Sequence, residues 1–225
     1  RDRVGKSASS ILARHMEVSM IKLYGLRMSN YYSLTKALLI EKGLEFEEIK
    51  APPSQKEENL VRSPMGKMPS IEVDGQSMSE SLAIFTYIER LQPEPALLPS
   101  DPFAAGKVME LVCHLKLDID LVARRCLPEL LFGKPVSEET KEQVRADLEK
   151  GIKAVSRLFV CDPYAMGAEF TIADLYTHYM FAVASAVATR VVNVDLLGER
   201  PRIAELLERL AGRPSIARVT AEMAA

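Results

Sequence analysis

The sequence lacks the cysteine pattern of a disulfide-rich or zinc-binding protein. Its three cysteines, Cys113, Cys126 and Cys161, are widely spaced, and they form no CxxC pair and lie near no histidine cluster. We interpret them as small buried apolar residues, and we predict no metal site. Because scattered, unpaired cysteines suit a reducing compartment, we expect a cytoplasmic protein.

Strong charge and long apolar stretches are missing as well. The formal net charge is −2 and the isoelectric point is about 6.0, so the chain carries no basic footprint for nucleic acid. No apolar run approaches the roughly 20 residues that a transmembrane helix needs. What remains is an ordinary globular balance, 48% hydrophobic and 27% charged, in a chain of 225 residues. That length is comfortable for two small domains.

Residues 1–18 differ from the rest of the chain. They are basic, rich in serine and almost free of acidic residues, which vaguely fits a transit peptide. The chain does not begin with methionine, and the first regular pattern starts at Met20. We interpret residues 1–18 as a leader or an appended extension, expect them to be disordered, and base the fold on the residues that follow.

The sequence after this extension alternates strand and helix patterns. Met20–Gly25 alternates apolar and polar residues and predicts a strand. A helix follows, with Ser29 or Asn30 as its N-cap and Gly43 just past its end. Leu44–Ile49 predicts a second, weaker strand. Strand, helix and strand in so short a span indicate a βαβ unit with a parallel pair and a right-handed crossover.

A β-hairpin and a helix complete the first half. Asp74-Gly75 supplies the positive φ angles of a two-residue type I′ turn. Pro69 lies just before this hairpin, although a proline removes a donor from a strand ladder. Ser79–Leu91 has apolar residues at helical spacing. The pattern predicts a βαβ–ββα domain over residues 19–97.

A proline-rich linker separates this domain from a helical one. Gln92–Pro102 contains four prolines, and proline at that density stiffens a chain into an extended form. No strand pattern survives beyond it, so residues 98–225 are predicted to form an all-helical domain.

Local signals mark the helices of this second domain. Phe103–Arg125 predicts a helix, with a break expected at Pro128. Ser137 can cap the next helix. Thr171 and Asp174 form a variant of the capping box at the start of a third helix, and we expect both to support folding rather than catalysis.

The order of these elements, with a set of short motifs, resembles the cytosolic glutathione transferase family from Met20 to about Val219. Each motif is weak alone, but the combination is specific. The motifs are LYG, EKGLEFEE, SPMGKMPSI, SESLAIFTYI, the proline-rich linker and GAEFTIADL. The resemblance implies a thioredoxin-like first domain and an all-α second domain. It also implies an enzyme of detoxification that uses glutathione as cosubstrate, works as a homodimer and needs no metal.

The resemblance also implies a glutathione site. The peptide bond before Pro69 would be cis, so that the backbone of Met68 pairs with the cysteinyl part of glutathione. Glu80 would bind the ammonium of the γ-glutamyl group and Ser81 its carboxylate, while Lys67 could meet the glycyl carboxylate. Plain structural explanations remain open: an edge-strand proline, a helix cap with a dipole-stabilising acid, and a surface charge.

The thiol of glutathione, with an ordinary pKa near 8.5, must become a thiolate to act as a nucleophile. The family supplies a hydrogen-bond donor after the first strand. Ser29 resembles the serine of theta-like and zeta-like classes and is the first choice for this catalytic donor, with Asn30 second. Tyr31 lies near the position where beta-like members carry a catalytic cysteine, and Tyr24 fits a donor less well. Alternatively, Ser29 is only a helix cap.

The leading hypothesis is that the glutathione thiolate attacks a small hydrophobic electrophile held between the domains. The apolar helix Phe103–Arg125 would line that second pocket. The lack of any cysteine before Cys113 argues against disulfide exchange. Two alternatives remain: a glutathione-dependent isomerase, although the zeta-like SSC signature is replaced by Ser29-Asn30-Tyr31, and a non-catalytic binding or assembly module. Neither a nucleic-acid partner nor a membrane is expected.

Overall fold

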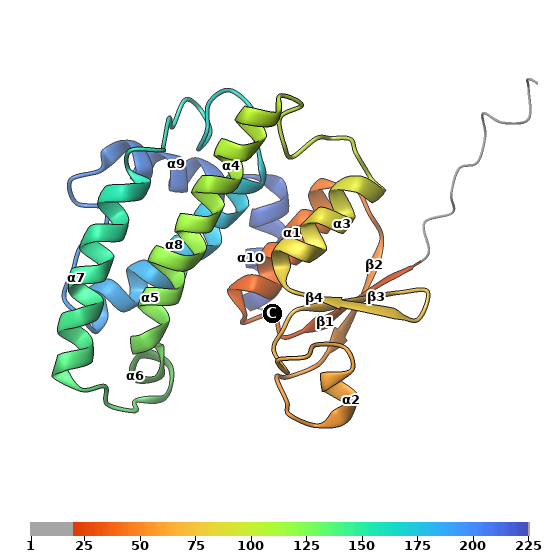
Figure 1. Cartoon of the computed structure of the whole chain (residues 1–225), viewed down its shortest axis with the longest axis horizontal. Coiled ribbons are helices and arrows are strands. Elements are labelled where there is room, and N and C mark those ends of the chain that lie inside the picture. Colours follow the sequence, from red (N-terminus) through yellow and green to blue (C-terminus); the bar gives the residue numbers. More distant parts are fainter. Residues whose placement is uncertain (1–19, 225) are drawn as a thin grey trace, which may run out of the picture.

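The structure is a computed structural model that describes residues 20–224, so the extension predicted at residues 1–18 lies outside the described residues. A four-stranded sheet with its helices occupies residues 20–91, here called the sheet region. Helices alone build residues 102–224, here called the helical region (Figure 1). The predicted fold class, a thioredoxin-like α/β unit followed by an all-α unit, is confirmed. The exact domain boundary after residue 97 stays a prediction.

The sheet has the predicted βαβ–ββα connectivity. β1 (Ile21–Gly25) pairs in parallel with β2 (Phe46–Lys50), and α1 (Asn30–Glu41) crosses between them. β1 also pairs antiparallel with β3 (Ser70–Val73), which forms a hairpin with β4 (Gln76–Ser79). The strand order is β2-β1-β3-β4. The N-terminus of α1 therefore emerges at the centre of the sheet.

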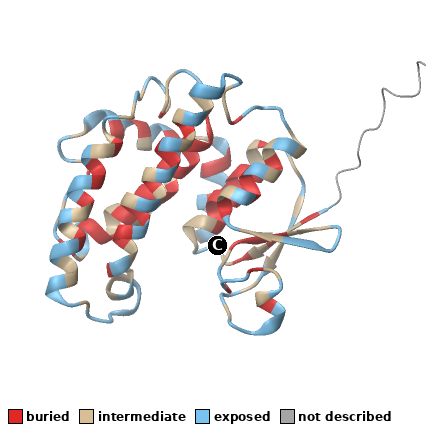
Figure 2. Cartoon of the chain, in the orientation of Figure 1, coloured by how far each residue is buried: buried red, intermediate tan, exposed pale blue. Residues whose placement is uncertain are grey.

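Two helices bury one face of this sheet. α1 and α3 (Ser81–Leu91) lie side by side above it, while the short α2 (Glu57–Leu60) lies in the long loop between β2 and β3 (Figure 1). Side chains alternate between the two faces of a strand. In β1, Ile21 and Leu23 are accordingly fully buried, whereas the intervening residues are only partly covered (Figure 2).

Turns and close contacts confirm several local predictions. Asp74 and Gly75 have φ values of 51° and 74°, as a type I′ hairpin requires. Ser29 is the N-cap of α1, and its side chain accepts a hydrogen bond from the amide of Tyr32. Only glycine fits at position 25, because a Cβ atom there would lie 2.4 Å from the ring of Tyr32.

The helical region begins with one long, irregular helical path. The helix expected over Phe103–Arg125 is present but changes its winding along its length. The break expected at Pro128 comes slightly earlier, at a 3₁₀ turn, and Pro128 lies in the first turn of the next helix, where its missing N–H costs nothing. The elements of this path are α4 (Pro102–His114), the π-helical η1 (Leu115–Asp120), α5 (Leu121–Ala123), the 3₁₀-helical η2 (Arg124–Cys126) and α6 (Leu127–Phe132).

Four further helices complete the region: α7 (Glu138–Val155), α8 (Ile172–Arg190), α9 (Pro201–Ala211) and α10 (Pro214–Ala224). α8 runs through the centre and is buried along most of its length (Figure 2). None of the helices within residues 20–224 combines the length and the apolar character that crossing a membrane demands.

The capping box predicted at the start of α8 is confirmed. Asp174 is fully buried, and its carboxylate accepts hydrogen bonds from the amides of Ala165, at 2.7 Å, and Thr171, at 2.9 Å. Burial raises the pKa of Asp174 to about 6 in spite of these bonds. All its hydrogen bonds remain within the helical region, which agrees with a structural role.

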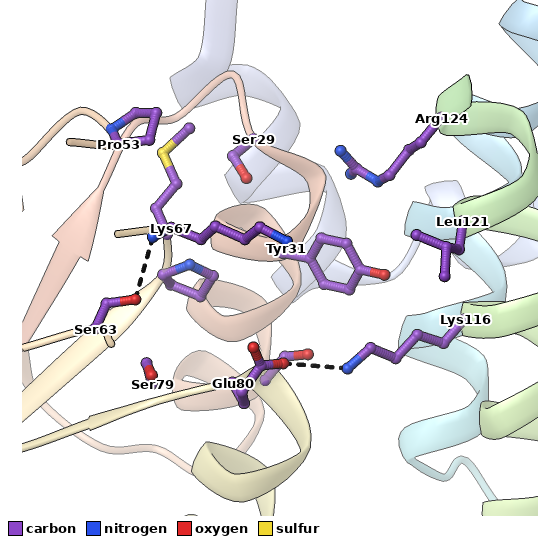
Figure 3. Close-up of a pocket in the computed structure, with 13 residues that line it drawn as sticks. Ser29, Tyr31, Pro53, Ser63, Lys67, Ser79, Glu80, Lys116, Leu121 and Arg124 are labelled. Carbon is purple, nitrogen blue, oxygen red and sulfur yellow. Dashed lines mark hydrogen bonds and ion pairs between the residues drawn. The ribbon is translucent and has the colours of Figure 1, made fainter. Parts of the chain in front are cut away.

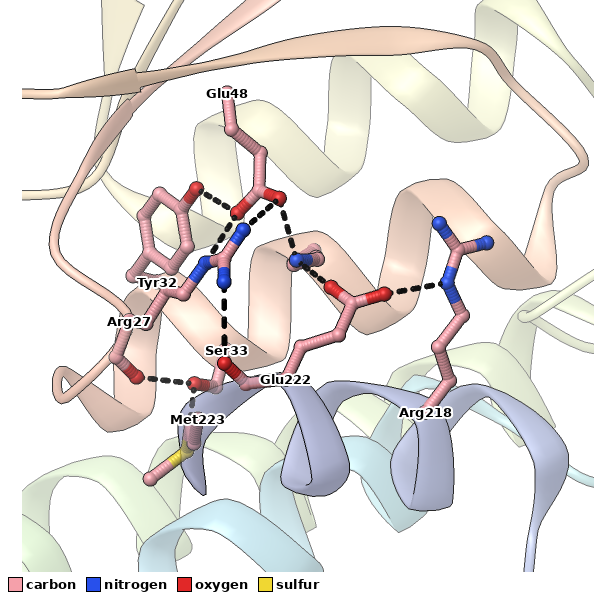
Figure 4. A network of polar contacts seen from close by, with 8 residues as sticks. Arg27, Tyr32, Ser33, Glu48, Arg218, Glu222 and Met223 are labelled. Carbon is pink, nitrogen blue, oxygen red and sulfur yellow. Dashed lines mark hydrogen bonds and ion pairs between the residues drawn. The ribbon is translucent and has the colours of Figure 1, made fainter. Parts of the chain in front are cut away.

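A charged network ties α10 to the sheet region (Figure 4). Lys36 on α1 is 1% exposed, and its ammonium pairs with Glu48 of β2, at 2.7 Å, and with Glu222 of α10. Arg27 and Tyr32 also donate to Glu48. Burial alone would raise the pKa of Glu48, but the hydrogen bonds from Lys36, Tyr32 and Arg27 outweigh it and lower that pKa to about 2. The ionised carboxylate therefore holds two cations and one phenol together.

We predict that Glu48→Gln lowers the free energy of unfolding by about 2–4 kcal/mol at pH 7, because it leaves Lys36 buried with one partner fewer. The contribution of Glu48 is present above its unfolded pKa, near 4.5, and is lost as the pH falls toward about 2. Urea unfolding at several pH values should show the gap between the two proteins closing over that range. Glu47→Gln, an exposed neighbour on β2, is the control, and an equal effect of both substitutions would contradict the prediction.

Candidate functional site

A cavity of about 330 Å³ opens between the sheet region and the helical region (Figure 3). One wall comes from the start of α1, the loop before β3, and the junction of β4 with α3. The other wall comes from the path α4–η1–α5–η2. The lining residues are Ser29, Tyr31, Pro53, Ser63, Lys67, Met68, Pro69, Ser79, Glu80, Ser81, Lys116, Leu121 and Arg124.

The structure brings together most of the residues that the sequence singled out. Those that line the cavity are Ser29, Lys67, Met68, Pro69, Glu80 and Ser81. They come from three separate segments of the chain, and the hairpin β3–β4 brings two of these segments together. Asn30 is not among the lining residues.

Ser29 presents its hydroxyl at the N-terminus of α1. Its oxygen accepts the amide hydrogen of Tyr32 at 3.4 Å, so its own hydrogen remains free to be donated into the cavity. The unpaired amides at the start of the helix give this end a positive potential. Capping the helix and binding an anionic sulfur are thus compatible tasks for Ser29.

Asn30 is already occupied by groups of the helical region. Its amide nitrogen donates to Asp120 at 3.1 Å and to the main-chain oxygen of Tyr179 at 3.3 Å. Its amide oxygen accepts from Arg124 at 2.6 Å. These bonds use both hydrogens of the amide, which weighs against Asn30 as a donor to a thiol.

Met68 and Pro69 form the floor of the cavity before β3. The Met68–Pro69 bond is cis, as the resemblance implied. No hydrogen bond joins the backbone of Met68 to the rest of residues 20–224, so its N–H and C=O are available to a ligand. The amide of the neighbouring Lys67 donates to the Ser63 hydroxyl at 3.2 Å, while its exposed ammonium forms no ion pair within residues 20–224.

Glu80 and Ser81 lie at the junction of β4 with α3. Glu80 occupies the cap position with a φ of 70°, an unfavourable conformation for this residue type. Its side chain does not cap the helix but pairs with Lys116 across the cavity, at 3.3 Å. Ser81 is the first residue of α3, and its hydroxyl lies 2.7 Å from that of Tyr176 on α8. Helix capping therefore does not explain why Glu80 and Ser81 stand at this position, because neither side chain caps α3.

Sequence reasoning missed the individual residues of the opposite wall. The Nζ atom of Lys116 and the Cζ atom of Arg124 lie 6.0 Å and 5.1 Å from the centre of the Tyr31 ring (Figure 3). Arg124 also donates to the buried Asp120 at 2.6 Å. A signal was present: the charged residues Lys116, Asp120 and Arg124 recur at intervals of four residues in this helix. The wall expected to be apolar thus contributes two cations and Leu121.

Five other apolar residues of that helix point away from the cavity. Val108, Leu111, Val112, Leu115 and Ile119 are at most 1% exposed and pack into the core of the helical region. The helix lines the cavity as predicted, but with two cations beside Leu121. Within residues 20–224, no group of three or more histidine, cysteine or acidic side chains is arranged to hold a metal ion.

Neither tyrosine near the first strand is free to donate to a sulfur atom. The Tyr31 hydroxyl donates to Asp120 at 2.9 Å, and burial together with that carboxylate raises the pKa of Tyr31 well above its ordinary value. The Tyr24 hydroxyl donates to Glu72 at 2.9 Å. Unlike these two phenols, the Ser29 hydroxyl donates to no other group within residues 20–224.

Fold and cavity together define a class: a thioredoxin-like unit whose first helix opens toward a wall supplied by a helical unit. Comparison with known proteins gives the family. The family model described as "Glutathione S-transferase, N-terminal domain" matches residues 23–96. A glutathione S-transferase of Pseudomonas putida is 40% identical over 203 residues, which cover 90% of this chain and 92% of the relative. The chain belongs to the glutathione S-transferase family.

Two further similarities extend this result. The maleylacetoacetate isomerase of Mus musculus is 30% identical over 124 residues, covering 53% of this chain and 54% of the relative. A glutathione S-transferase of Methylobacterium radiotolerans, solved in complex with glutathione sulfonate, superposes with a TM-score of 0.74. At 24% identity over 89% of this chain and 94% of the other, that similarity supports the fold.

We predict that Asn30→Ala destabilises the protein by about 1–3 kcal/mol, because Asp120 and Arg124 each lose a partly buried hydrogen bond. Ser29→Ala, one residue away, should cost only about 1 kcal/mol through loss of a cap. Urea unfolding of both variants measures the difference. If the two variants were equally stable, the polar cluster around Asn30 would not hold the two regions together.

Proposed function

We propose that this protein conjugates the thiolate of glutathione to a small electrophile, with Ser29 as the donor that stabilises the thiolate. The observation that carries the proposal is the convergence of Ser29, Met68-Pro69 and Glu80-Ser81 on one cavity. A hydroxyl at a helix N-terminus faces one end of this cavity, and unpaired backbone groups line its floor. A carboxylate and a buried serine lie at the other end.

These groups match the parts of glutathione in order. The sulfur would lie at Ser29, where the O–H and the positive end of α1 favour the thiolate. The cysteinyl backbone would pair with Met68. Glu80 would bind the ammonium of the γ-glutamyl group, and Ser81 would bind the carboxylate of that group. Lys67 would bind the glycyl carboxylate at the C-terminal end of the peptide.

The electrophile would lie between the sulfur and the opposite wall. The ring of Tyr31 and the side chain of Leu121 offer apolar contact, as a hydrophobic electrophile requires. We also infer a homodimer in the cytoplasm from the family, and both points rest on that resemblance alone.

We predict that Ser29→Ala lowers kcat/KM with glutathione and an aryl halide by about 10²-fold, the usual effect of losing one donor to a developing anion. The pKa of the bound thiol should rise toward its free value, which thiolate absorbance as a function of pH measures directly. Ser29→Thr, which keeps a hydroxyl, is the matched control and should retain most of the activity. Unchanged turnover in Ser29→Ala would assign the donor to a backbone amide instead.

A second candidate function is a glutathione-dependent cis–trans isomerisation of an acidic substrate. Two observations favour it: the cations Lys116 and Arg124 on the opposite wall, and the similarity to a maleylacetoacetate isomerase. In such a reaction glutathione adds to the double bond and leaves again unchanged. Conjugation consumes glutathione, so the two reactions differ in stoichiometry.

We predict that, if isomerisation is the main reaction, maleylacetoacetate is converted with glutathione present in less than molar equivalence. Lys116→Gln should then raise KM for this dianion by about 10-fold, the value of one charged hydrogen bond. Lys107→Gln, on the same helical path but outside the cavity, is the control. Consumption of glutathione without any change of isomer would exclude this second candidate.

A further inference from the structure

A hydrogen bond between two buried hydroxyls links the helical region to the candidate glutathione site. Tyr176 on α8 is fully buried and does not line the cavity, yet its hydroxyl lies 2.7 Å from the hydroxyl of Ser81. Ser81 does line the cavity and is 3% exposed. Tyr176 therefore stands directly behind a residue that faces the ligand.

The direction of this hydrogen bond decides what Ser81 can do. Each hydroxyl carries one hydrogen and can both donate and accept. If Ser81 donates to Tyr176, it has no hydrogen left for a ligand. If Tyr176 donates to Ser81, the Ser81 hydrogen is free to point into the cavity. A carboxylate only accepts, so it is compatible with the second arrangement alone.

Tyr176 is suited to the donor role. A phenolic O–H is more acidic than the aliphatic O–H of serine and is therefore the better donor of the two, and Ser81 is the only hydrogen-bond partner of Tyr176 among residues 20–224. A chain of hydrogen bonds from Tyr176 through Ser81 to a carboxylate polarises each of its members, and each bond strengthens the next. Through these hydrogen bonds, α8 fixes the orientation of the Ser81 hydroxyl, which lines the cavity.

We propose that Tyr176 is a positioning residue that makes Ser81 a donor to the α-carboxylate of the γ-glutamyl group. The proposal rests on the proposed function, which places glutathione in this cavity. It assigns the site a specificity: thiols with that carboxylate are bound more tightly than otherwise identical thiols without it, and the difference depends on a residue outside the cavity.

The chain offers a matched control one turn further along α8. Tyr179 is 4% exposed, and its hydroxyl has no hydrogen-bond partner among the described residues. Tyr176→Phe and Tyr179→Phe thus each remove a buried phenolic oxygen from the same helix. They differ in that the first oxygen contacts Ser81.

The experiment is calorimetric titration of the full chain with two peptides. One is glutathione, and the other is 4-aminobutyryl-cysteinyl-glycine, which lacks the α-carboxylate and is otherwise the same. Tyr176→Phe should weaken glutathione binding about 5- to 20-fold and leave binding of the analogue within about twofold of its original value. Tyr179→Phe should change neither. With glutathione at saturation, kcat should be unaffected in both variants, because Ser29 is intact.

A double-mutant cycle with Ser81→Ala isolates the link. Once Ser81 has no hydroxyl, Tyr176→Phe should cause no further loss of glutathione affinity. Replacing Tyr176 with 3-fluorotyrosine keeps the ring and the hydroxyl, so a change in binding would not come from a disturbed fold. The fluorinated phenol is a stronger donor and should tighten glutathione binding without affecting the analogue.

Several results would overturn the proposal. These are equal glutathione affinity in Tyr176→Phe and Tyr179→Phe, an equal loss for both peptides, an undiminished effect of Tyr176→Phe in the Ser81→Ala background, or no response to the fluorinated residue. If the unmodified protein bound neither peptide, the proposed function would fail with it. Conjugation activity that survives without any preference for the α-carboxylate would overturn the role of Tyr176 alone.

Discussion

The arrangement of the candidate site depends on one buried carboxylate. Asp120 is fully buried between the two regions, and it accepts hydrogen bonds from Asn30 and Tyr31 on one side and from Arg124 on the other. A charge removed from water is tolerated only when it is well paired. The start of α1 and the wall opposite must therefore stay in contact, because separating them would take Asn30 and Tyr31 away from Asp120 and leave it with Arg124, from its own helical path.

The same constraint assigns different tasks to three consecutive residues. Asn30 and Tyr31 turn their polar groups toward Asp120, which fixes the first turn of α1. Ser29, just before them, keeps its hydrogen free and faces the cavity. The neighbours hold the helix in place, and Ser29 is left to interact with a ligand. Since all three are polar residues at a helix start, only their tertiary contacts distinguish them.

That distinction explains what the sequence could and could not predict. Features governed by local chemistry were predicted: the turn at Asp74-Gly75, the cap at Ser29 and the capping box of Asp174 all depend on residues a few positions apart. The resemblance supplied the position of Pro69 and the pair Glu80-Ser81. Lys116, Arg124 and Tyr176 were not found individually, because their roles come from contacts across 36, 94 and 95 residues of sequence. The π-helical turn at Leu115–Asp120 also shifts which side of that helix faces the cavity, and no local signal announces it.

The network around Lys36 has a consequence for the order in which the protein is assembled. Lys36 is buried near the start of the fold, yet one of its two carboxylate partners, Glu222, follows 186 residues later. Contacts of such long separation form slowly, because much of the chain must be ordered before they do. During synthesis, the sheet region emerges from the ribosome when only one of the two carboxylate partners of Lys36, Glu48, has been made. The loop that carries Ser29 is bound to the same network through Arg27, so it is completed only when the last helix has docked.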